Sequence, residues 1–144
     1  MIPACRTHGV DEILALPDVQ ERVATYEAYR DKAADQIKRC TAVHRNVGVL
    51  DNRGEDEIVV TNRFLVYALF PAINISIHVF AGREQVNTVF AVGKSVLNRT
   101  SRTNVGALML EYGGGHENAG TCQIEDHEAD QVLAGLIERI GRDG

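Results

Sequence analysis

Hydrophobic residues recur at three- and four-residue steps through the first third of the chain, which is the spacing of one face of an α-helix. The residues on this face are Val19, Val23, Tyr26, Ala33, Ile37 and Cys40. Pro17 lies just before the pattern, and we expect a long helix that begins here with Asp18 as its N-cap. A shorter helix is expected over residues 11–16. The long helix can belong to the core or connect this domain to another one, and the pattern leaves both roles open.

After residue 46 the pattern changes to the alternation and the short apolar runs that are typical of β-strands. We expect strands at residues 47–50, 57–60, 73–79, 86–92 and 120–124. The run 86–92 is apolar on both faces, so it is expected near the centre of the sheet. A short helix should follow Thr61 or Asn62 and end before Pro71. Another should begin at Asn104 and lead into a glycine-rich stretch.

The last twenty residues predict a strongly amphipathic helix, which Asp126 is expected to cap. Its apolar stripe consists of Ala129, Val132, Leu133, Leu136, Ile137 and Ile140. The cluster of Asp126, His127 and Glu128 is therefore interpreted as a helix start and not as a ligand set. The pattern as a whole predicts an α/β fold with a mixed sheet of about five strands flanked by helices. We expect residues 1–44 to form a helical connector and residues 45–144 to form the α/β domain.

Size and composition fit one globular domain. The chain has 144 residues, of which 44% are hydrophobic and 24% charged, and this length supports one hydrophobic core. No apolar run approaches the length of a membrane span, and the first residues do not resemble a secretion signal. The three cysteines are far apart and do not form a disulfide framework, so Cys40 and Cys122 are expected to be buried thiols. These features predict a protein of the reducing cytoplasm.

The distribution of charge predicts a site for a discrete anion. The formal net charge of −5 argues against indiscriminate binding of nucleic acid. No acidic residue occurs between Glu84 and Glu111, whereas Lys94, Arg99 and Arg102 all fall inside this window. A cationic site on an acidic protein selects a small anion over a long polyanion. A chance gap in the acidic residues is the alternative interpretation.

A glycine-rich stretch, Tyr112-Gly113-Gly114-Gly115-His116-Glu117-Asn118-Ala119-Gly120, carries the strongest chemical signal in the chain. Consecutive glycines allow a backbone with positive φ and expose N–H groups without a Cβ in the way. The histidine adds a side-chain donor at the same place, and donors without acceptors suit a phosphate. The alternative is a helix C-cap followed by a sharp turn, in which the histidine only caps a carbonyl.

With a helix before it and a strand after it, this stretch resembles the GGGH signature of the DHH-associated domain, the C-terminal half of DHH-family phosphoesterases. Three further segments resemble the exopolyphosphatase-related branch, which includes the oligoribonucleases and pAp phosphatases. These segments are 62–71, 92–100 and 120–123, so the resemblance extends over residues 44–140. Many relatives carry a fourth glycine before the histidine and an alanine where this chain has Gly120.

The resemblance implies a catalytic half that this chain does not carry. DHH-family enzymes hydrolyse phosphate esters with two manganese ions, held by aspartates and histidines of an N-terminal domain. The chain contains neither an Asp-x-Asp nor an Asp-His-His motif, and its five histidines are scattered. We therefore expect no catalytic residue, metal ligand or cofactor here, with manganese in the separate DHH domain. The chain is expected to be an excised or separately encoded C-terminal domain.

The resemblance also implies the residues that bind substrate. The backbone of Gly113, Gly114 and Gly115 would donate to a phosphate, and His116 would contact it next to the reacting centre. The family uses a Ser/Arg segment before the glycine-linked helix, and its counterparts here are Ser95, Asn98, Arg99, Ser101 and Arg102. Arg99 is the first candidate, because a guanidinium group pairs well with phosphate oxygens. Weaker candidates are Arg63 and Lys94, whereas His44 and His78 are interpreted as structural.

Two functions stay open at this point. The first is the substrate-binding domain of a phosphoesterase that acts on short oligonucleotides, pAp-like nucleotides or polyphosphate, with the N-terminal DHH domain as its partner. The second is a non-catalytic RNA-binding or oligomerisation module, like the related domain of alanyl-tRNA synthetases. The segments 92–95 and 120–123 favour the first function. The missing catalytic motifs leave the second open, and no membrane partner is expected. Whether the domain pairs with itself is also left open.

Overall fold

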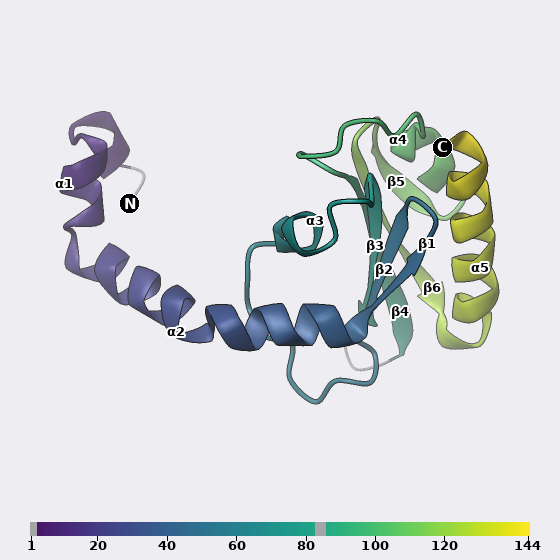
Figure 1. Ribbon diagram of the computed structural model, residues 1–144, viewed down its shortest axis with the longest axis horizontal. Helices are drawn as coiled ribbons and strands as arrows, with labels where there is room; N and C mark the ends of the chain where they lie inside the picture. The colour runs from purple at the N-terminus through teal and green to yellow at the C-terminus, as the bar shows by residue number, and fades with distance from the viewer. Residues whose placement is uncertain (1–2, 83–85) are drawn as a thin grey trace.

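The computed structural model describes residues 3–82 and 86–144 and has the predicted α/β architecture, with one mixed sheet between helices (Figure 1). The strands are β1 Thr41–His44, β2 Val47–Asp51, β3 Ile75–Ala81, β4 Asn87–Lys94, β5 Gly113–His116 and β6 Ala119–Glu125. The helices are the 3₁₀-helix η1 Ala4–Arg6 and the α-helices α1 Val10–Leu14, α2 Pro17–Cys40, α3 Leu65–Leu69, α4 Val105–Met109 and α5 Asp126–Asp143.

The sheet has six strands in the order β1-β2-β3-β4-β6-β5. Only the pair of β2 and β3 is parallel, and the other neighbours are antiparallel. Strand β4 lies between β3 and β6, which confirms the central position predicted for residues 86–92. Glu84, which bounds the acid-free window of the sequence, lies outside the described residues.

Strand β1 was not predicted. It pairs with β2 through a tight turn in which Arg45 has a φ of 59°. Its four residues are mostly exposed at the sheet edge, so they lack the apolar alternation that identifies a half-buried strand. Residues 41–44, which the sequence pattern placed at the end of the connector, therefore lie in the sheet.

The strand predicted at residues 57–60 is wrong, because this segment has no strand partner. The side chain of Gln36 binds its backbone instead. Gln36 Nε2 donates to the carbonyl oxygen of Glu57 at 2.8 Å, and Gln36 Oε1 accepts the N–H of Val59 at 2.9 Å. The apolar run is held against α2 as an extended segment outside the sheet.

The helix starts differ from the prediction in two places. Asp18 is not the N-cap of α2, because Leu16 occupies that position and Pro17 is the first helical residue. Proline fits there since the first N–H of a helix has no partner. Asp126 is likewise the first residue of α5, and its carboxylate accepts the hydroxyl of Thr88 at 2.7 Å. Asn104 caps α4 as predicted, with its Oδ1 accepting the N–H of Ala107.

Helix α5 covers one face of the sheet, with α4 beside it (Figure 1). The main core lies between these helices and the side chains of β3, β4 and β6, and it includes Ile75, Ile77, Val79, Phe90, Val92, Cys122, Leu136 and Ile140. Cys122 is buried as predicted, and burial raises its pKa to about 11. Cys40 is only half-buried.

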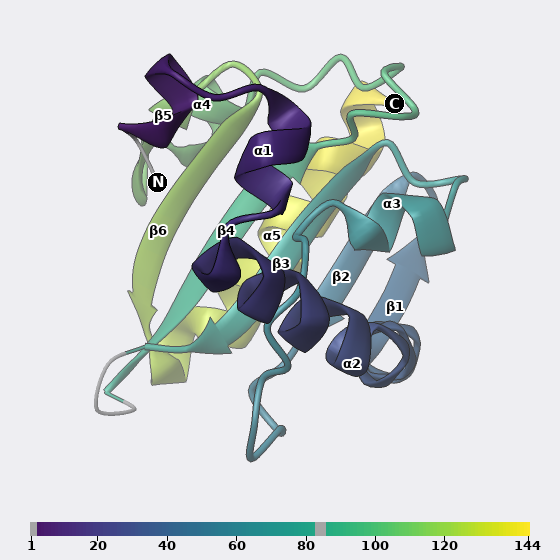
Figure 2. The same ribbon diagram turned by 90° about the vertical axis from the view of Figure 1, so that its left-hand side faces the viewer.

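The opposite face of the sheet is covered only in part. The end of α2 and helix α3 pack on β2 and β3 around Ile37, Leu50, Val66, Tyr67 and Ile73. Figure 2 views this face and shows β4 and β6 running past the end of that cover. Among residues 3–82 and 86–144, none of the helices combines the length and the hydrophobicity needed to cross a bilayer.

Candidate functional site

The stretch of three glycines and a histidine forms an edge strand and not a loop. Strand β5 pairs with β6 from Gly113↔Cys122 to His116↔Ala119, and Glu117 and Asn118 form the turn between them. The predicted helix before it and strand after it are both present, as α4 and β6. The positive φ that consecutive glycines allow does not occur here, because among the described residues only Arg45 and Gly144 have it.

Close backbone approach explains the glycines instead. A Cβ on Gly113 would lie 2.4 Å from the carbonyl oxygen of Thr121, and one on Gly115 would lie 2.5 Å from that of Ala119. Gly114 differs, because a Cβ there would have no atom within 4 Å. The two outer glycines are therefore required by packing against β6, whereas the central glycine leaves open space.

That open space belongs to a cavity on the face of the sheet opposite α5. The cavity has a volume of about 480 Å³, which is within the range of small-molecule sites. Two rows of paired residues cross its floor, His78–Ala91–Thr121–Gly114 and Ser76–Gly93–Ala119–His116. Most of these side chains are small, so a ligand can approach the backbone of the sheet.

The walls come from three segments that lie far apart in the sequence. Arg63 and Phe64 lead into α3, Lys94 ends β4 and Val96 follows it, and Asn118 belongs to the turn after β5. Tyr67 of α3 reaches the floor, where its hydroxyl contacts Ser76 Oγ and donates to the carbonyl oxygen of Gly93, both at 2.7 Å. These two hydrogen bonds fix α3 on the sheet and define the edge of the cavity.

The end of the cavity at β5 gathers donors for an anion. His116 is exposed, and its Nδ1 accepts the N–H of Asn118 at 3.3 Å. In a neutral imidazole this leaves the proton on Nε2, where it is available to a ligand. Lys94 Nζ lies 3.9 Å from Glu117 Oε1, with only 14% of the lysine side chain exposed. Because β5 is the last strand of the sheet, alternate backbone N–H groups also lack a neighbouring strand.

The structure brings together three of the eight predicted site residues at this cavity, namely Gly114, Gly115 and His116. Gly113 lies on the opposite side of β5, in register with Cys122. Ser95 is buried, and its Oγ accepts the N–H groups of Leu97 and Asn98 at 3.1 and 2.9 Å. Ser95 therefore shapes the turn after β4.

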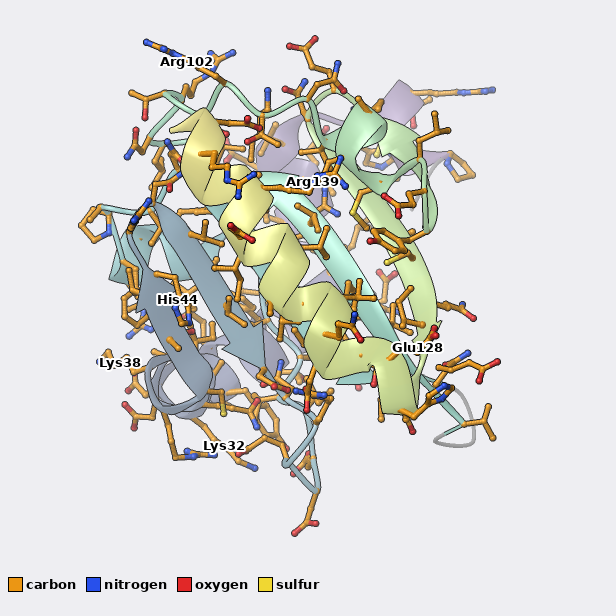
Figure 3. The ribbon with its side chains drawn as sticks, turned by 90° about the vertical axis from the view of Figure 1, so that its right-hand side faces the viewer. Lys32, Lys38, His44, Arg102, Glu128 and Arg139 are labelled. Atoms are coloured by element: carbon orange, nitrogen blue, oxygen red, sulfur yellow. The ribbon has the colours of Figure 1, made fainter. Side chains whose placement is uncertain are left out.

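The other three predicted residues lie on the loop between β4 and α4. Asn98 donates to the carbonyl oxygen of Ala72 and accepts the hydroxyl of Thr100. Arg99 and Arg102 are exposed, and Figure 3 shows Arg102 extending away from the body of the domain. None of the three lines the cavity. That Arg99 and Arg102 bind substrate stays a prediction.

Sequence reasoning missed His78. It lines the cavity from β3, on the same face as Ser76. Burial lowers the pKa of His78, and the positive charge of Arg63 lowers it further. The alternation of β3 carried the signal, because the isoleucines of this strand identify the core face and so place His78 on the other one. His44, by contrast, is exposed on β1 (Figure 3).

The part of the chain that the structure describes contains no group of three His, Cys, Asp or Glu side chains that could hold a metal ion. These residues therefore do not fit the pair of manganese ions that the resemblance implies. The expectation that manganese belongs to another domain stays a prediction.

Comparison with solved structures gives two informative likenesses. The first is to a pGpG-specific phosphodiesterase, PggH from Vibrio cholerae, with 50% sequence identity and a TM-score of 0.90. The match covers 99% of this chain and 49% of that one, so the chain spans about half of the length of the phosphodiesterase. The second is to the DHH domain of a protein described as a member of a family of ribosomal proteins.

This second likeness has 13% identity and a TM-score of 0.54, and it covers 85% of this chain and 32% of the other. It shows a shared fold. The search against protein-family models found no match, and neither did the search of curated proteins. The likeness to the phosphodiesterase agrees with the resemblance to phosphoesterases seen in the sequence. The assignment to the DHH-associated domain and to a branch of that family stays a prediction.

Proposed function

We propose that this chain is the substrate-binding half of a DHH-family phosphoesterase that acts on short guanine-containing oligonucleotides such as pGpG. The observation that carries the proposal is the 50% identity to a pGpG-specific phosphodiesterase over 99% of this chain. The cavity beside β5 adds physical support, because it has a cationic end and an apolar wall. The catalytic step would belong to a metal-binding partner domain.

The cavity chemistry favours a nucleotide over polyphosphate. Lys94 and His116 can hold a phosphate at one end, where hydrogen bonds to an ionised group are the strongest kind. Beyond them the lining turns apolar and aromatic, with Phe64 and Val96 on the walls and Ala91 on the floor. A flat heterocyclic base suits such a surface, whereas a chain of phosphates would leave it unused. Within the range that the resemblance allows, pGpG and pAp-like nucleotides are therefore preferred.

A titration followed by ¹H–¹⁵N NMR tests this function on the 144-residue chain. The ligands are pGpG, pAp, tripolyphosphate and a single-stranded oligouridine. With pGpG we expect shifts at Lys94 and at residues 114–121, and weaker effects with tripolyphosphate. The loop 95–102 should shift as well if Arg99 contributes.

The matched control compares His116→Ala with His127→Ala, because both histidines are exposed but only His116 lines the cavity. His116→Ala should weaken the binding of pGpG, and His127→Ala should leave it unchanged. Shifts confined to α2 would place the ligand elsewhere and contradict the proposal. A stronger response to oligouridine than to pGpG would favour the alternative of a general RNA-binding module.

A further inference from the structure

The cavity has a second polar end, which the phosphate site at β5 does not use. Arg63 and His78 form it, from the segment before α3 and from strand β3. What they bind follows from the nucleotide-binding function proposed above, and the inference rests on that function.

The spacing of the two ends suits one nucleotide. His78 and Gly114 occupy the two ends of a single row across the sheet, with β4 and β6 between their strands. Three inter-strand steps of about 4.8 Å separate them by about 14 Å. A phosphate at the β5 end would therefore place its own nucleoside along the row, with the base directed toward β3.

The hydrogen-bonding capacity of this end is available to a ligand. Within the described residues, no hydrogen bond uses either ring nitrogen of His78, so its one donor and one acceptor are free. Arg63 is exposed, and its guanidinium lies 4.9 Å from the centre of the Phe64 ring. Tyr67 does not compete for a ligand, because its hydroxyl is bonded to Ser76 and Gly93.

We propose that Arg63 and His78 recognise the O6 and N1–H edge of a guanine base. Arginine has only donors, so it can pair with the guanine O6 acceptor but not with the adenine amino group. An acceptor nitrogen of His78 can take the adjacent N1–H of guanine, whereas adenine has an acceptor at N1. Both positions of the edge are inverted between the two bases, so Arg63 and an acceptor nitrogen of His78 fit guanine together, whereas adenine offers Arg63 no acceptor at position 6.

The apolar wall completes this subsite. Phe64 and Val96 line the cavity, with the Phe64 ring against the Arg63 guanidinium, and the small Ala91 forms the floor next to His78. A base that lies on this floor has its polar edge toward Arg63 and His78 and its faces against apolar atoms. Stacking on an aromatic side chain stabilises any base, so the selectivity comes from the polar pair.

The test compares four ligands on the 144-residue chain by NMR titration: GMP, IMP, AMP and ribose 5-phosphate. IMP keeps O6 and N1–H and lacks only the 2-amino group of guanine. We expect GMP and IMP to bind equally within about twofold, and AMP to bind at least about tenfold more weakly. Ribose 5-phosphate should shift residues 114–121 but not His78.

Two variants test whether Arg63 and His78 cause the preference for GMP over AMP. Arg63→Met and His78→Leu should each reduce the preference for GMP over AMP by about fivefold or more, while the affinity for ribose 5-phosphate stays unchanged. Arg142→Met and His127→Leu are the matched controls on α5, at the other face of the sheet. Melting curves confirm that each variant is folded. If a variant unfolds, the comparison of the four ligands on the unaltered chain still tests base recognition.

The outcomes separate the two proposals. Equal affinity for AMP and GMP in the unaltered chain would overturn base recognition and leave phosphate binding intact. A loss of ribose 5-phosphate affinity in Arg63→Met would make Arg63 a phosphate ligand, which also overturns the proposal. Absence of shifts at residues 114–121 with every ligand would overturn the proposed function itself.

Discussion

The side chain of Gln36 binds the backbone of Val59 in the way that a neighbouring strand would, with its Oε1 accepting the N–H at 2.9 Å. Gln36 is 7% exposed, and its Nε2 also donates to the carbonyl oxygen of Glu57 and to the carboxylate of Glu55. One amide on α2 thereby positions the segment that leads from β2 to the Arg63 wall of the cavity.

Replacement of Gln36 by alanine should therefore lower the free energy of unfolding by about 1–3 kcal/mol, because the buried N–H of Val59 loses its partner. Urea denaturation measures the change, and Gln20→Ala on the exposed part of α2 is the control. Equal stability of the two variants would mean that water binds the N–H of Val59 as well as the side chain of Gln36 does.

Gly113 and Gly114 of β5 are expected to serve different purposes, the first in stability and the second in ligand binding. Gly113→Ala places a methyl group 2.4 Å from a carbonyl oxygen and should cost about 1–3 kcal/mol of stability. The methyl group added by Gly114→Ala would have no atom within 4 Å, so this variant should change stability by less than about 0.5 kcal/mol. It should nevertheless weaken the binding of pGpG, because the added methyl group projects into the cavity. Thermal melting and NMR titration measure the two effects, and equal melting points would contradict this division.

The stability of the protein should depend on pH through His78. Its folded pKa lies below the unfolded value of 6.5 because of burial, with Arg63 as a second cause. Below about pH 6.5 the unfolded chain therefore binds a proton that the folded chain does not, and stability falls as the pH falls toward the folded pKa. The loss of unfolding free energy between about pH 7.5 and 5.5 should be smaller in His78→Gln than in the unaltered chain.

His127→Gln is the control for this measurement, because its side chain is 72% exposed. Its pH dependence gives the reference for the loss of an exposed histidine. Carboxylates that also titrate in the folded state are common to all three proteins, so they cancel in the comparison. An unchanged pH dependence in His78→Gln would show that His78 is protonated equally in both states.

Hydrolysis should be absent from the chain by itself. With added manganese, the pure 144-residue protein is expected to leave pGpG intact, since no cluster of metal ligands occurs among residues 3–82 and 86–144. The Vibrio phosphodiesterase serves as the positive control in a chromatographic assay of product. Turnover that EDTA abolishes and that His116→Ala reduces would overturn the expectation that catalysis needs a second domain.

The sequence predicted those elements in which burial of one face produces a hydrophobic pattern along the element itself. The isoleucines of β3 alternate because one face of that strand is buried, and the stripe of α5 repeats because one face of the helix meets the sheet. Strand β1 and the segment 57–60 depend on distant partners, β2 and Gln36, whose positions no local pattern contains.

The lining of the cavity was predictable at its β5 end and not at the end formed by Arg63 and His78. Gly114, Gly115 and His116 are adjacent in the sequence, so their motif identifies them together. The motif does not distinguish glycines required by φ from those required by close approach, and that distinction needs the position of Thr121. His78 reaches the cavity only because β3 pairs with β4 and α5 covers the other face, which is a property of the assembled sheet.

Helix α2 is anchored to the domain near its C-terminal end and extends away from it (Figure 1). Near its C-terminal end, Ala33 and Ile37 are buried, and Ile37 belongs to the cluster around α3 and β2. Val23 and Tyr26, farther out, are 44% and 40% exposed. Pro17 lies sixteen residues before Ala33, or about 24 Å along the helix axis. A tilt of about 5° at the anchored end would move Pro17 and the attached α1 by about 2 Å. Any body fixed to α1 would therefore be displaced relative to the cavity by about 2 Å through this small rotation.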